Sequence, residues 1–105
     1  MDISELEKLS VGKLSISEMP TSFVGEVVQT EVREDRRGKK ALFVGVMTEK
    51  GKIIIKYSGL HIEDVIKFMR ENNIKSLDEL VGKKVKFELQ YYKIGNPRHI
   101  PKQIL

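Results

Sequence analysis

The sequence predicts a single, mainly β domain with five strands and one helix. Its 105 residues fit one domain, because most domains contain roughly 100–200 residues. Short segments rich in β-branched residues alternate apolar and polar positions, and one later segment has helical periodicity. The chain contains no cysteine, so disulfides and thiolate metal sites contribute nothing to this fold.

We expect residues 1–21 to be an N-terminal extension and residues 22–105 to be the folded domain. Within the extension, Ile3, Leu6 and Leu9 recur every three residues. This spacing predicts one or two helical turns before the domain begins.

Residues 22–34 are predicted to form the first strand, because β-branched side chains dominate the segment. Three valines share one face: Val24, Val28 and Val32. Phe23 and Val27 fall on the opposite face, and Gly25 between them indicates a bulge or a sharp bend. A long, strongly bent strand accounts for both patterns.

Residues 41–48 and 52–57 are predicted to be the second and third strands, joined by a hairpin turn at 49–51. One face of the second strand is expected to be core: Leu42, Val44 and Val46. Phe43 and Met47 lie on its other face, which is also apolar. That second face must therefore be partly covered or used for binding.

The helix is predicted over residues 61–72, because four apolar residues follow the i, i+3, i+4, i+7 pattern. These are Ile62, Val65, Ile66 and Met69. Asn73 is expected to end the helix. The spacing of Ser76 and Glu79 then predicts a capping box on a short helical turn.

Residues 83–93 and 98–104 are predicted to be the fourth and fifth strands, separated by a turn at Gly95-Asn96-Pro97. Alternation in the fourth strand places four side chains inward: Val85, Phe87, Leu89 and Tyr91. Tyr92 is then expected to point outward. Pro101 lacks an amide donor and so confines the fifth strand to an edge or a chain end.

The order of these elements over residues 22–104 resembles the OB-fold, a small Greek-key barrel of five strands with a helix between the third and fourth. Gly25 in the long first strand, the hairpin at 49–51 and the segment Leu80-Val81-Gly82-Lys83-Lys84-Val85 carry this resemblance. The resemblance implies an OB-like barrel that binds oligonucleotides on the face of strands two and three, between the loops that join strands one to two and four to five.

Two basic blocks contain those two loops, which are expected at residues 36–40 and 91–98. Residues 36–56 carry seven basic and one acidic side chain, and residues 83–105 carry six and one. The blocks are compatible with a surface that binds nucleic-acid phosphates. The alternative is a solvated, lysine-rich face that keeps the protein soluble, but the coincidence of both blocks with the two ligand-binding loops favours nucleic acid.

The expected nucleic-acid contacts combine cations for phosphates with aromatic rings for stacking on bases. They are Arg36, Arg37, Lys39, Lys40, Phe43, Lys56, Tyr92, Lys93 and Arg98. Two alternatives stay open. Phe43 could instead be covered by the N-terminal extension, and Tyr92 could pack on the stem of a neighbouring lysine.

Catalytic, metal and cofactor signatures are not found in the sequence. His61 and His99 are the only histidines, and their spacing fits no metal-ligand motif. We therefore expect a protein that is not an enzyme and has no cofactor and no metal. No apolar run approaches the ~18 residues that span a bilayer, so we expect a cytoplasmic protein with no membrane partner. Abundant Lys, Glu and Ile resemble a thermophilic composition.

The leading hypothesis is a non-catalytic protein that binds single-stranded DNA or RNA, used in DNA replication or repair. A translation-type RNA-binding barrel would use the same mechanism. The alternative is a small accessory subunit that docks on a larger DNA-processing complex, such as a polymerase holoenzyme, through its extension or an exposed strand edge. The face that carries Phe43 and Met47 discriminates between these hypotheses, because it is open in the first and covered in the second.

Overall fold

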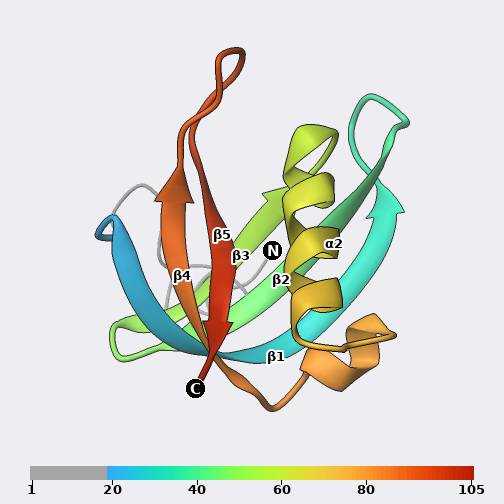
Figure 1. Ribbon diagram of the computed structural model, residues 1–105. Coiled ribbons are helices and arrows are strands. Elements are labelled where there is room, and N and C mark those ends of the chain that lie inside the picture. The colour runs from blue at the N-terminus through green and yellow to red at the C-terminus, as the bar shows by residue number, and fades with distance from the viewer. Residues whose placement is uncertain (1–18) are drawn as a thin grey trace, which may run out of the picture.

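The computed structural model of the protein describes residues 19–105, so the helical turns expected near Ile3–Leu9 lie outside the described residues. The described part is mainly β, with a five-stranded antiparallel sheet, a helix and a short 3-10 turn (Figure 1). Its elements are β1 (Ser22–Glu34), β2 (Lys40–Thr48), β3 (Gly51–Tyr57), α2 (Leu60–Glu71), η2 (Leu77–Leu80), β4 (Lys84–Gln90) and β5 (Arg98–Ile104).

The sheet has the strand order β3-β2-β1-β4-β5, and every neighbouring pair is antiparallel. β1 is shared between two partners, because its first residues pair with β4 and the rest pair with β2. Within residues 19–105, β3 and β5 are the edges and no ladder joins them. The sheet is strongly curved but is not closed into a barrel, so the predicted closure is not confirmed (Figure 1).

β1 bends near Gly25, as predicted, with a register irregularity between Val27 and Gln29. A Cβ on Gly25 would lie 2.4 Å from Cγ1 of Val46, closer than two carbon atoms can approach. The face of β1 that carries Val24 and Val32 is not its buried face. Phe23 and Val27 are the buried side chains of β1, whereas Val24 is 44% and Val32 is 57% exposed. The bend turns the start of the strand over the core and the end of it toward solvent.

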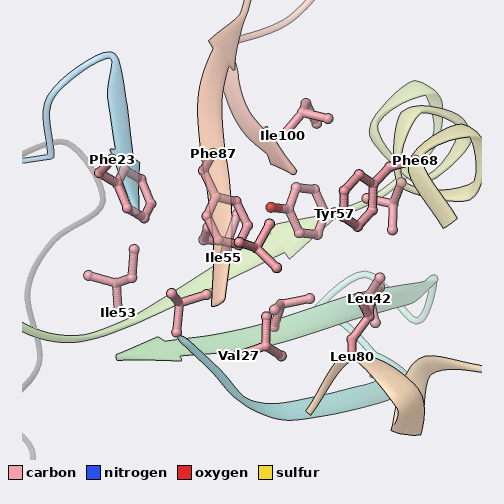
Figure 2. Packing of buried hydrophobic residues seen from close by; sticks show 14 of the residues in the cluster. Phe23, Val27, Leu42, Ile53, Ile55, Tyr57, Phe68, Leu80, Phe87 and Ile100 are labelled. Carbon is pink, nitrogen blue, oxygen red and sulfur yellow. The ribbon is translucent and has the colours of Figure 1, made fainter. Parts of the chain in front are cut away.

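The core fills the concave side of the sheet (Figure 2). The core face predicted for β2 is confirmed, because Leu42, Val44 and Val46 are all buried. Phe23 stacks on Phe87, with ring centroids 5.2 Å apart. The remaining buried side chains come mainly from β3, β4, β5 and α2 and include Ile53, Ile55, Tyr57, Val65, Phe68, Val85 and Ile100.

Tyr57 brings a hydroxyl group into this core. The hydroxyl donates a hydrogen bond of 2.6 Å to the main-chain carbonyl of His99. The bond satisfies a buried polar group and connects β3 with β5, the two strands at the edges of the sheet. Burial also raises the pKa of the Tyr57 hydroxyl well above its ordinary value.

The helix face that periodicity predicts is confirmed in part, because Val65 is buried and Ile62 and Met69 pack against the core while partly buried. Phe68 is also buried, and Ile66, which was expected to be buried, is 41% exposed. α2 packs beside β5, and this contact turns the face that carries the larger Phe68 ring inward. The predicted end of the helix is confirmed. Asn73 has a left-handed φ of 56°, and the amide of Ile74 donates to the carbonyl of Met69 at 2.8 Å, the pattern of a Schellman cap.

The predictions for the short turn η2 and for the fifth strand are confirmed. The Glu79 carboxylate accepts a 2.9 Å hydrogen bond from the amide of Ser76, which completes the predicted capping box. Pro101 lies in the edge strand β5, opposite Phe87 and next to a register irregularity. The predicted length of the fourth strand is wrong, because β4 ends at Gln90 rather than Lys93.

Candidate functional site

The loop between β1 and β2 is organised by its first residue, Asp35. The amide of Gly38 donates to the Asp35 carbonyl at 3.0 Å, and Gly38 has a φ of 76°. This is a type I turn followed by a left-handed glycine, a common hairpin loop. The Asp35 carboxylate also accepts hydrogen bonds from the amides of Arg37 at 2.8 Å and Lys39 at 3.0 Å. The loop is therefore ordered from within, while the Arg36 and Arg37 side chains stay exposed.

The same carboxylate connects the loop to β3. Nζ of Lys56 lies 3.0 Å from the second carboxylate oxygen of Asp35. This bond to Lys56, with the two amide bonds, lowers the pKa of Asp35 to about 2. Lys56 was predicted as a phosphate contact, but part of its charge is compensated by Asp35, and it also holds the loop against the sheet.

A cleft of about 960 Å³ opens beside this loop. Seven of the predicted contact residues line it: Arg36, Arg37, Lys39, Lys40, Phe43, Lys56 and Arg98. Arg98 and Asn96 come from the chain after the β4–β5 loop has turned, so both predicted loops border the same cleft. Figure 1 shows these two loops extending from the same end of the sheet. Among the described residues that line the cleft, seven are basic and two are acidic.

Phe43 is half-buried on the wall of this cleft. The guanidinium carbon of Arg33 lies 4.2 Å from the centre of the Phe43 ring, a cation–π contact. Nε of Arg33 also lies 3.8 Å from a carboxylate oxygen of Glu31. One face of the ring is therefore covered by a flat cation, and Arg33 itself lines the cleft. Arg33 is not among the contacts predicted from the sequence. The antiparallel register, in which Glu31 opposes Phe43, is the signal that could have found it.

Tyr92 and Lys93 do not line the cleft. The Tyr92 hydroxyl donates a hydrogen bond to the Asp64 carboxylate at 2.5 Å, and its ring meets the His61 ring edge to face at 4.9 Å. Burial and the Asp64 bond raise the pKa of Tyr92. The predicted orientation of the tyrosine pair is wrong, since Tyr91 is 69% exposed. The chain leaves the sheet after Gln90, and the alternation of a strand no longer applies there.

The two histidines have structural partners. Burial and then the charge of Arg98 lower the pKa of His61, so this ring is neutral at pH 7 where it packs on Tyr92. His99, in β5, is only 5% exposed. Its Nε2 lies 2.7 Å from the Pro20 carbonyl, which fixes the start of β1 against β5.

No family model matches this chain, and no curated protein matches it at a significant level. Within residues 19–105, no three His, Cys, Asp or Glu side chains gather closely enough to hold a metal ion. The helices in that same range are all too short or too polar to cross a membrane.

Proposed function

We propose that this protein binds single-stranded nucleic acid, DNA or RNA, in the basic cleft and has no catalytic activity of its own. The observation that supports the proposal is the cleft itself, which gathers seven predicted contact residues from segments as distant as Arg36 and Arg98. A polyanion would be drawn there by charge, and its affinity would fall steeply with added salt.

Each part of the cleft has a role in this proposal. Arg36, Arg37, Lys39 and Lys40 contact phosphates from the β1–β2 loop, which Asp35 keeps ordered. A base stacks over the Arg33 guanidinium that lies on Phe43, since both aromatic rings and guanidinium planes accept bases. One such stack contributes ~1–3 kcal/mol to binding.

The proposal includes the fold. The element order and the position of the cleft agree with an OB-like Greek-key barrel, whose ligands lie between the same two loops. The hydrogen bond from Tyr57 on β3 to His99 on β5 supports closure of the sheet between these edges. Backbone amide exchange along β3 and β5 tests it, because paired amides exchange more slowly than free edges.

A fluorescence-anisotropy titration tests the binding proposal. The probes are single-stranded DNA, single-stranded RNA and a duplex, each at several salt concentrations. We expect single strands to bind more tightly than the duplex. Replacing Arg36, Arg37, Lys39 and Lys40 with alanine should reduce the slope of log affinity against log salt by up to ~2.8 on single strands. An unchanged slope would contradict the proposal.

A matched control removes four lysines that are exposed and lie outside the cleft: Lys50, Lys67, Lys83 and Lys84. This variant has the same net charge as the cleft variant. It should retain the wild-type salt slope if phosphates bind in the cleft. An equal reduction of the salt slope in both variants would mean that the protein attracts nucleic acid only through its overall charge.

Arg33→Lys separates stacking from charge. Lysine keeps the positive charge but has no guanidinium plane to stack on Phe43 or on a base. We expect about a fivefold or greater loss of affinity for single strands, with the salt slope unchanged, because the lost stack is worth ~1–3 kcal/mol.

A second surface favours the accessory-subunit alternative. An apolar groove of about 360 Å³ lies between α2 and the paired strands β1 and β2, with Val32 and Ile66 exposed in it. Lys40 and Lys75 border the groove. Its occupant would be an amphipathic helix with acidic flanks, presented by a larger DNA-processing protein. Ile66→Asp should abolish such docking and leave single-strand binding intact.

A further inference from the structure

The β4–β5 loop, residues 91–97, has an anchored base and an exposed apolar tip. At the base, Tyr92 donates its hydrogen bond to Asp64 and packs on His61, so the loop is fixed to α2. At the tip, Ile94 is 85% exposed, the highest value among the large apolar side chains of the described residues. Tyr91, which directly precedes the anchored Tyr92, is 69% exposed. The anchor thus holds apolar side chains away from the core.

The surroundings of this tip are cationic and adjoin the cleft. Lys93 precedes Ile94 and is exposed. After the tip, the chain returns through Asn96 and Arg98, which line the cleft. A ligand strand that leaves the cleft on this side therefore meets an apolar loop tip beside positive charge.

The end of a nucleic-acid duplex is chemically complementary to this apolar loop tip and the positive charge beside it. Its terminal base pair presents a flat apolar face between two phosphate backbones, and apolar side chains such as isoleucine pack against base steps in other nucleic-acid complexes. A flexible single strand offers no comparable rigid face. We propose that Ile94 packs on the last base pair of a duplex whose single-stranded tail lies in the cleft. The protein would then recognise single-strand/duplex junctions, an inference that rests on the proposed function.

The test compares three probes: a duplex with a single-stranded oligothymidine tail, the tail alone and the blunt duplex. Tails of either polarity are used. We expect the wild-type protein to bind one tailed duplex about fivefold more tightly than the tail alone, roughly the ratio that partial burial of one isoleucine gives. Ile94→Ser should reduce this ratio to about one and leave the affinity for the tail unchanged. Ile94→Leu should retain the ratio.

Leu105→Ser is the matched control, because Leu105 is 61% exposed and lies at the C-terminus, at the opposite end of the molecule from the loop tip (Figure 1). It should behave as wild type. Equal wild-type affinities for tail and tailed duplex would overturn the junction proposal, as would an equal loss on both probes in Ile94→Ser. Binding to vesicles of anionic lipid that disappears in Ile94→Ser would overturn it in favour of a membrane-contacting loop.

The same titrations distinguish this inference from the proposed function. If the tail alone binds but the ratio is one, only the junction proposal fails. If the tail alone does not bind, the proposed function fails, and the junction proposal fails with it.

Discussion

The two loops that border the cleft are held by different kinds of interaction. The β1–β2 loop is ordered by hydrogen bonds within residues 35–39, all of which involve Asp35. The β4–β5 loop is fixed by Tyr92, whose partner Asp64 is 28 positions away in the chain and belongs to α2. The first loop therefore forms its internal hydrogen bonds once β1 and β2 pair and gains one ion pair from Lys56 of β3, whereas the second loop has its anchor on the helix.

The largest effect is expected from a variant that removes α2 from the core. Val65 is 2% exposed, and Val65→Asp would bury a charge without a partner. We expect this variant to lose cooperative thermal unfolding and near-ultraviolet circular dichroism. The next residue provides the control, because Ile66 is 41% exposed and Ile66→Asp should melt cooperatively. A soluble, cooperatively folded Val65→Asp protein would show that the core-facing side of α2 is misassigned.

A second pair of variants loosens one loop at a time. In Asp35→Asn the neutral amide no longer pairs with Lys56 and accepts weaker hydrogen bonds from Arg37 and Lys39. The amides of the β1–β2 loop should then exchange faster, while those of residues 91–97 keep their wild-type rates. Asp64→Asn, which weakens the bond from Tyr92, should have the reverse effect. If either variant changed the amide exchange rates of both loops, the two loops would not be ordered independently.

The loops should also respond to acid at different pH values. The pKa of Asp35 falls from 3.8 to about 2, so the stability that its carboxylate contributes is complete above pH 3.8 and is lost as the pH drops toward about 2. Burial, followed by the charge of Arg98, lowers the pKa of His61 from 6.5. The folded state then binds fewer protons than the unfolded state, so the contribution of the neutral ring declines as the pH falls below 6.5.

Acidification should consequently loosen the β4–β5 loop before the β1–β2 loop. Nuclear magnetic resonance spectra recorded across this pH range would report both loops at once. His61→Gln, which has no titrating ring, should remove the transition of the β4–β5 loop and leave that of the β1–β2 loop. Simultaneous transitions of both loops in the wild type would contradict the assignment of the β4–β5 transition to His61 and of the β1–β2 transition to Asp35.

The smallest effect concerns single cations on the two loops. Arg37 lines the cleft, whereas Lys93 is exposed outside it. Arg37→Ala should lower the salt slope for single strands by ~0.7, the value for one phosphate contact. Lys93→Ala should leave that slope unchanged on a single strand. If Lys93→Ala lowered the slope and Arg37→Ala did not, the bound strand would lie on the outer side of the β4–β5 loop.

Local chemistry explains which features the sequence predicts correctly. Strand β2 and its core face follow from alternation within a few residues. The helix end at Asn73 and the capping box of Ser76 and Glu79 depend on hydrogen bonds between near neighbours. The positions of the two basic loops follow from turn residues and charge. These features require no knowledge of what the chain packs against.

The direction in which side chains point, in contrast, was decided by tertiary contacts. The bend of β1 over β2 buries Phe23 rather than Val24, and the packing of α2 beside β5 buries Phe68 rather than Ile66. The chain departs from the sheet after Gln90 and turns Tyr92 toward α2. Periodicity specifies which residues share a face, but the free energy of burying that face depends on partners distant in the chain.

The candidate site combines both kinds of information. Most of its cations could be named from the sequence because their loops were predicted correctly. Arg33 could not, because its place over Phe43 depends on how β1 and β2 pair. Tyr92 changed from an expected ligand contact to an anchor because its hydroxyl and ring find Asp64 and His61. The sequence by itself determined the elements and the charge of the loops. Only the tertiary structure decided which side chains face the cleft, because the cleft is formed by segments that are distant in the chain.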